Sequence, residues 1–126
     1  MTVLLDASVV LAVLLDEPGA PEPEGSLRQA NISAVNYSEV IRRLVDGGMA
    51  LEDATNEVDR LHIQVIPFDR VQAVDAAGLR PATRKIGASF ADRACLGFAL
   101  RSGLPVLTAD RRWSELDLPI EIRQIR

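Results

Sequence analysis

The amino-acid sequence predicts an α/β fold in which a mostly parallel central sheet is flanked by helices. Short runs rich in leucine and β-branched residues alternate with segments of helical periodicity, an order typical of parallel sheets. The 126 residues are 48% hydrophobic, which is enough for one buried core. A chain of this length leaves little room for a second domain, so we expect residues 1–126 to form a single domain.

Five short runs predict strands because leucine and β-branched residues dominate them. They lie at residues 2–5, 32–35, 63–66, 105–108 and 120–123. Pro67 ends the third run, and the last run is expected to be an edge strand.

Helices are predicted where apolar residues recur at helical spacing. They cover residues 7–15, 36–45, 51–61, 70–79 and 89–103, with a short helical turn that begins at Asp110 and surrounds Trp113. Asn36, Asp69 and Ser89 are the predicted N-caps, and Gly47 and Pro81 are predicted to end or break helices. Residues 16–25 contain three prolines and predict an exposed loop, followed by little more than one helical turn at 26–30.

Composition and charge exclude several classes of protein. There are 18 acidic side chains against 14 basic ones, and this balance argues against a general nucleic-acid coat. The only cysteine, Cys95, cannot form an internal disulfide, and one cysteine with one histidine cannot make a zinc site. We expect Cys95 in the core and His62 in the third strand, with a structural role. Any metal would be held by oxygen.

The apolar run at residues 3–15 is interpreted as buried core. A secretory signal would carry positive charge before its apolar region, yet the first basic residue is Arg28. Asp6 interrupts the run, and the apolar segment after it is too short to cross a bilayer. We therefore expect a cytoplasmic protein without a membrane span.

Four acidic residues are expected at one edge of the sheet. Asp6 follows the first strand directly, and Asp110 follows the fourth by two residues. Glu39 and Asp92 are each expected in the first turn of a helix, and these turns can face the same edge. Ligands of parallel sheets bind beyond the carboxyl ends of the strands, so the four carboxylates could converge there.

Taken singly, each of these residues has a simpler interpretation as a helix cap. Taken together, several carboxylates at one edge would repel one another and raise their own pKa values, and a divalent cation removes that cost. Mg²⁺ fits oxygen ligands of this kind, and Mn²⁺ would suit them equally. Such a cluster favours metal-assisted displacement at phosphorus.

Three stretches resemble the PIN-domain ribonucleases, in particular the VapC toxins of bacterial toxin–antitoxin pairs. They are VLLDASVVLAVLLDEPG, ISAVNYSEVIRRL and GASFADRACLGFALRSGLPVLTADRRW. The resemblance covers nearly the whole chain, in the right order. It implies that Asp6, Glu39, Asp92 and Asp110 are the catalytic, metal-binding residues, and that Ser8 and Thr108 are their hydroxyl partners.

The resemblance also implies an activity and partners. The chain would be a Mg²⁺- or Mn²⁺-dependent endoribonuclease that cleaves RNA, is silenced by a cognate VapB-type antitoxin, and forms a homodimer. The PEPEG segment departs from the family pattern, because it should shorten a helix that contributes to the antitoxin groove and the substrate approach.

Two alternatives are weighed against this interpretation. A phosphoacceptor receiver domain needs an acidic pair after its first strand and a lysine after a late one. Here Asp6 stands alone before Ala7, and the only lysine, Lys85, lies outside any predicted strand end. The other alternative is a catalytically silent PIN binding module, which the presence of all four acidic residues disfavours.

Overall fold

A computed structural model describes residues 2–22 and 27–126, and it confirms the predicted α/β fold. Within this part of the chain, five parallel strands form one sheet in the order β3-β2-β1-β4-β5. The strands are β1 (Val3–Leu5), β2 (Ala30–Ser33), β3 (Gln64–Ile66), β4 (Val106–Thr108) and β5 (Ile122–Gln124). β5 lies at an edge, as predicted.

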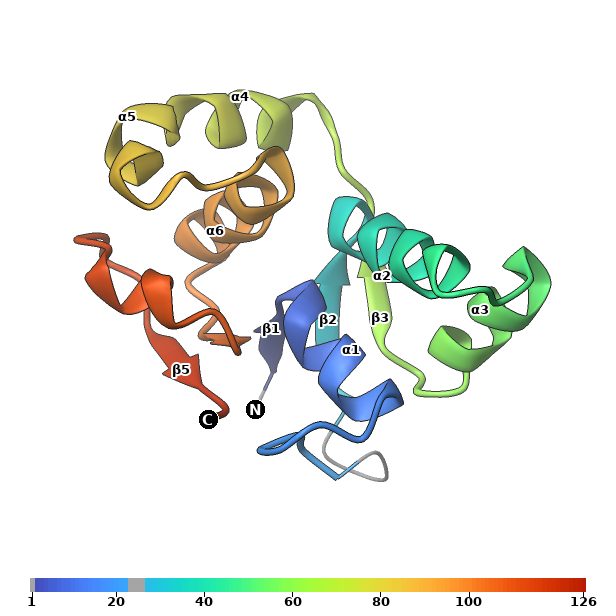
Figure 1. The fold of residues 1–126 in the computed structure, drawn as a ribbon. Helices are drawn as coiled ribbons and strands as arrows, with labels where there is room; N and C mark the ends of the chain where they lie inside the picture. The colour runs from blue at the N-terminus through green and yellow to red at the C-terminus, as the bar shows by residue number, and fades with distance from the viewer. Residues whose placement is uncertain (1, 23–26) are drawn as a thin grey trace.

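Helices flank the sheet and connect its strands (Figure 1). The α-helices are α1 (Ala7–Leu14), α2 (Ala34–Asp46), α3 (Leu51–Asp59), α4 (Arg70–Gly78), α5 (Arg80–Thr83) and α6 (Phe90–Ser102). Two short 3₁₀ helices are η1 (Arg84–Ile86) and η2 (Arg111–Glu115). None of the helices in the described ranges is long and apolar enough to cross a membrane.

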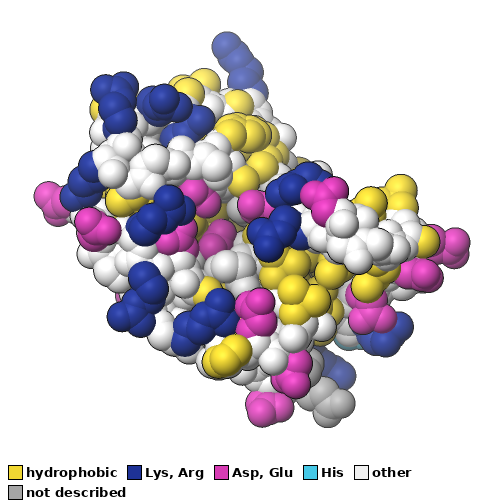
Figure 2. Space-filling model, in the orientation of Figure 1, with side chains coloured by type: hydrophobic (Ala, Val, Ile, Leu, Met, Phe, Trp, Pro, Cys, Tyr) yellow, Lys and Arg dark blue, Asp and Glu magenta, His cyan; other side chains and the backbone are white. Residues whose placement is uncertain are grey.

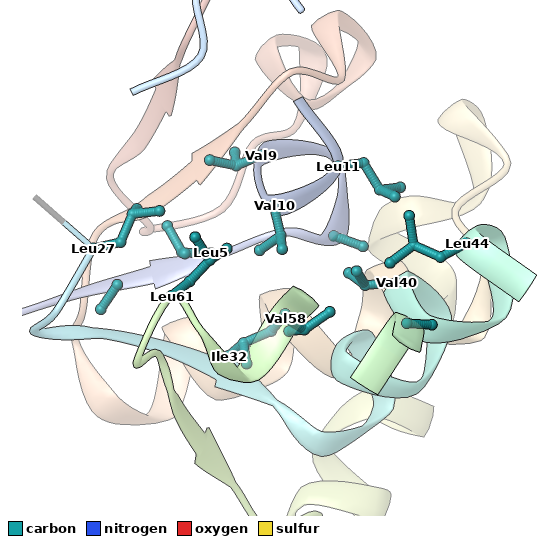
Figure 3. Packing of buried hydrophobic residues seen from close by; sticks show 13 residues of the cluster. Leu5, Val9, Val10, Leu11, Leu27, Ile32, Val40, Leu44, Val58 and Leu61 are labelled. Atoms are coloured by element: carbon teal, nitrogen blue, oxygen red, sulfur yellow. The ribbon is translucent and has the colours of Figure 1, made fainter. Parts of the chain in front are cut away.

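The central strand β1 divides the buried residues into two clusters. Successive side chains of a strand point to opposite faces, so Leu5 joins one cluster and Leu4 the other. The first cluster packs Leu5 against α1, β2, α2 and α3 (Figure 3). The second contains Leu96 of α6, Val106 of β4 and Trp113 of η2. Cys95 is buried in this cluster, as predicted.

Several helix boundaries agree with the predictions from local sequence. Asp69 and Ser89 accept capping hydrogen bonds from the backbone nitrogens of Gln72 and Asp92. Gly103 ends α6 with φ +76°, a left-handed conformation that suits glycine. Residues 16–22 form neither helix nor strand, as expected of the predicted loop, whereas residues 23–26 of that loop and of the predicted turn lie outside the described residues.

Predictions for two segments of the chain were wrong. The second strand ends at Ser33, whose Oγ accepts a hydrogen bond from the Val35 backbone nitrogen and caps α2. Asn36 therefore lies inside the helix and Glu39 lies beyond its first turn, because the extended serine at the strand end already supplies the cap. His62 is not in the third strand but precedes it with φ +56°, in a turn.

We predict that Trp113→Ala lowers the free energy of unfolding by roughly 3–5 kcal/mol, because it removes a fully buried aromatic side chain (0% exposed) from the second cluster. Urea unfolding monitored by circular dichroism measures this. The control is Val74→Ala on α4, where the side chain is 65% exposed and a change within about 0.5 kcal/mol is expected. Equal losses in the two variants would contradict this packing.

Candidate active site

The candidate site lies where the order of the strands switches direction. From β1, the chain adds β2 and β3 on one side of the sheet and β4 and β5 on the other. A crevice forms beyond the carboxyl ends of the strands at such a switch point. Asp6 follows β1 directly and Asp110 stands two residues after β4, so these two predicted site residues flank the switch.

Asp6 is nearly buried, with 5% of its surface exposed. It precedes α1, but its side chain makes no capping hydrogen bond to that helix. Its Oδ2 instead accepts hydrogen bonds from Ser8 Oγ at 2.7 Å and Thr108 Oγ1 at 2.9 Å. The interpretation of Asp6 as a simple helix cap is therefore wrong, and the two predicted hydroxyl partners do contact it.

Asp92 and Glu39 reach the same place from two helices. Asp92 forms a capping box with Ser89, in which its Oδ2 accepts from the Ser89 backbone nitrogen at 2.9 Å. Asn36, one turn before Glu39 in α2, donates from Nδ2 to the Ala91 carbonyl oxygen at 3.0 Å. This hydrogen bond joins α2 to the first turn of α6 and so fixes the backbone positions of the two carboxylates.

Three of the four predicted carboxylates act on one another electrostatically. Burial raises the pKa of Asp6 to about 6, and the negative charges of Asp92 and Glu39 add to the rise, whereas its two hydroxyl partners oppose it. Burial and the charge of Asp92 also raise the pKa of Glu39, while nearby arginines of α2 oppose that rise. The three groups therefore share one electrostatic environment.

Asp110 differs because Arg112 already compensates its charge. Its Oδ1 accepts from the backbone nitrogen and from Nε of Arg112, both at 3.0 Å, and its Oδ2 accepts from Nη2 at 2.6 Å. These contacts hold the pKa of Asp110 below its ordinary value. Asp110 thus caps η2, as its simpler interpretation predicted, while Nη1 of Arg112 donates to the Ile86 carbonyl oxygen at 2.9 Å.

All four predicted carboxylates line one open cleft of about 380 Å³. Arg43, Arg112 and Arg126 also line it, each from a different part of the chain. Figure 2 shows this arrangement as acidic side chains in a hollow with basic side chains around it. The cleft therefore offers oxygen ligands at its floor and positive charge at its rim, a combination that suits a phosphodiester substrate.

The four carboxylates do not form a preformed metal-binding cluster. Among residues 2–22 and 27–126, no three histidine, cysteine, aspartate or glutamate side chains form a cluster that could hold a metal ion as they stand. Burial, together with the negative charges of their neighbours, raises the pKa values of Asp6 and Glu39. The predicted roles of these residues in metal binding and catalysis stay predictions.

Three arginines that line the cleft, and Asn36 behind it, were not predicted as site residues from the sequence. The sequence predicts Asn36 as a cap, although its position three residues before Glu39 already places both on one side of a helix. Arg43 and Arg112 could have been inferred from their neighbours, because Arg43 follows Glu39 by one helical turn and Arg112 lies two residues after Asp110, whereas Arg126 reaches the cleft only through the tertiary fold. Arg126 reaches it from the last position of the chain, where its Nη2 lies 3.3 Å from Glu17 Oε1.

Comparisons with solved structures identify the fold. VapBC2 from Rickettsia felis, bound to promoter DNA, gives a TM-score of 0.76 at 14% identity and covers 98% of each chain. DNA-bound VapBC from Salmonella typhimurium gives 0.76 at 20% identity, covering 100% of this chain and 99% of that one. FitAcB from Neisseria gonorrhoeae gives 0.64 at 22% identity, covering 99% and 98%. No curated protein matches the sequence closely enough to count as a relative.

The sequence itself matches a family model. Residues 3–118 match the PIN domain, which spans all four predicted carboxylates and both hydroxyl partners. The strand order differs from the 2-1-3-4-5 order of receiver-type sheets, which argues against the phosphoacceptor alternative. Because the match extends over most of the chain, the protein belongs to the PIN domain family.

Proposed function

We propose that this protein is a metal-dependent endoribonuclease and the toxin of a VapBC-type pair, acting in the cytoplasm. The observation that supports it most is the position of Asp6, Glu39 and Asp92 around one cleft at the switch point of a PIN-domain sheet. The chemistry is hydrolysis of a phosphodiester bond in RNA.

The donor set fits Mg²⁺ or Mn²⁺. Asp6, Glu39 and Asp92 supply hard oxygen donors. Burial, and to a smaller extent like charge, raises the pKa values of Asp6 and Glu39, and a bound cation would stabilise both groups in their ionised form. When bound, the cation would lower the pKa of a water and stabilise charge on the leaving oxygen.

The side chains around the cleft would have separate roles in the proposed reaction. Ser8 and Thr108 hold the Asp6 carboxylate in one orientation. Glu39, which is half-buried and has a raised pKa, is suited to orient the attacking water and accept its proton. Arg43 and Arg112 at the rim would attract the phosphates on either side of the cleaved bond. Asp110 would contribute through Arg112 or as an outer ligand.

The partners are part of the same proposal. Structures that share this fold include complexes described as VapBC, although their low identity to this chain supports the fold alone. A VapB-type antitoxin would cover the cleft and silence the enzyme, and the protein would form a homodimer. Growth arrest on expression of this chain, relieved by co-expression of a short neighbouring reading frame, would support both the toxin and its antitoxin.

We predict that the purified protein cleaves single-stranded RNA in Mg²⁺ or Mn²⁺, and that Asp6→Asn lowers kcat at least about a hundredfold, because it removes a metal ligand. Gel analysis of a labelled oligoribonucleotide measures both. Asp117→Asn, an acidic position outside the cleft, is the matched control and should cleave normally. Cleavage that continues in excess chelator would contradict the metal mechanism, and binding without cleavage would favour the silent module.

Metal binding should also stabilise the fold. At a Mg²⁺ or Mn²⁺ concentration about 100 times the dissociation constant, we expect a gain of about 2.7 kcal/mol in the free energy of unfolding, because only the folded state holds the ion. Thermal unfolding with and without metal measures the shift. Asp6→Asn should reduce it and Asp117→Asn should not; equal shifts in both variants would place the ion elsewhere.

The raised pKa of Asp6 predicts a pH dependence of stability in metal-free protein. The pKa rises from 3.8 to about 6 on folding, so the stability from this group is full below about pH 4 and is lost as the pH rises through 6. The loss amounts to about 3 kcal/mol. Asn does not titrate, so Asp6→Asn should be more stable than wild type at pH 7.5 but not at pH 4.

Urea unfolding in chelator at these two pH values tests this, with Asp117→Asn as the reference for the other titrating groups. If Asp6→Asn and wild type respond identically to pH, Asp6 does not carry a raised pKa.

A further inference from the structure

We propose that Phe90, supported by Phe68 and Arg93, forms a platform on which an unpaired RNA base stacks beside the cleft. This inference rests on the proposed ribonuclease function and specifies how the substrate would be held. Bases of single-stranded RNA are commonly recognised by stacking on aromatic and arginine side chains.

Phe90 lies close to the proposed chemistry. It is the first residue of α6 and stands directly after Ser89 and two residues before Asp92, both of which line the cleft. A base stacked on Phe90 would thus belong to a nucleotide close to the phosphate held at the cleft. Figure 2 shows hydrophobic side chains gathered over the beginnings of α4 and α6, next to the acidic hollow.

The Phe90 ring is supported from two sides. Phe68, just before α4, meets Phe90 edge to face, with ring centroids 5.6 Å apart and planes at 90°. The guanidinium carbon of Arg93 lies over the Phe90 ring, 6.0 Å from its centroid, and Nη1 donates to the Ala76 carbonyl oxygen at 3.1 Å. The ring is therefore held in place while 51% of the side chain stays exposed.

A single exposed apolar side chain needs no explanation in a soluble protein, so the combination is what matters. The chain has only three phenylalanines, and two of them pair here beside a fixed cation. A cation beside an aromatic ring suits a ligand that has both a π-face and a phosphate, which describes a nucleotide.

A protein partner is the competing occupant. The neighbouring exposed side chains of α4 and α6, Val71, Val74 and Leu100, are aliphatic and cannot stack on a base, so they are the better candidates for contact with protein. Phe90 differs from them in its aromatic pair, its cation and its place two residues from Asp92. These differences favour RNA at Phe90.

The test measures the affinity of protein carrying Asp6→Asn, in which cleavage is expected to be slow, for a single-stranded oligoribonucleotide that the wild type cuts. Phe90→Leu should weaken binding roughly 5- to 100-fold, because leucine keeps the apolar volume but has no ring. Phe90→Trp should bind at least as well as the parent, and Val74→Ala should bind equally. The salt dependence should stay the same in all variants, because no phosphate contact is lost.

Abasic substitutions in the oligoribonucleotide give a second readout. Removing one base near the cleavage position should weaken binding to the Phe90 parent but have no further effect on Phe90→Leu. If Phe90→Leu binds RNA like its parent, or if it changes only the oligomeric state or antitoxin binding, the stacking proposal is overturned. If wild-type protein neither cleaves nor binds any RNA, the proposed function itself fails.

Discussion

The burial of the Asp6 carboxyl group at the end of the central strand constrains the rest of the site. Asp6 is tied to β4 twice, by its backbone nitrogen to the Leu107 carbonyl oxygen at 3.0 Å and by its side chain to Thr108. A carboxylate in this position loses its hydration, and two hydroxyl groups compensate only in part, as its raised pKa shows. The Asp6 carboxylate would therefore be stabilised by additional positive charge at this edge of the sheet.

The strand order determines which elements surround Asp6. Because β1 lies between β2 and β4, α2 and α6 reach the Asp6 end of the sheet from different connections and bring further carboxylates. The Asn36 bond to Ala91 joins these helices beside the site. An overall charge of −4 does not exclude a substrate that carries phosphates, because three arginine side chains line this cleft.

Local signals predicted the parts of the fold that depend on neighbours in sequence. The caps at Asp69 and Ser89 are of this kind, since each serves a backbone nitrogen three residues ahead. The cap of α2 was misplaced because Asn36 and Ser33 are both good caps, and only packing against Ala91 decides that Asn36 is buried. The convergence of the carboxylates could be predicted from the strand ends, whereas the position of Arg126 at the cleft depends on tertiary contacts that no local pattern in the sequence predicts.

The pairing of Asp110 with Arg112 bears on how many cations the cleft would need. A carboxylate whose charge is already compensated by a guanidinium gains less from a nearby ion than an uncompensated one, and three hydrogen bonds from Arg112 already occupy the carboxylate oxygens of Asp110. Burial raises the pKa values of Asp6 and Glu39 more than their hydrogen bonds and the nearby arginines lower them. The charge of Asp92 raises the pKa of both further. The carboxylates that additional positive charge would stabilise most therefore lie on the side of the cleft formed by β1, α2 and α6. Under the proposed metal mechanism, this distribution favours one cation position beside Asp6 and leaves Arg112 to supply the positive charge on the β4 side.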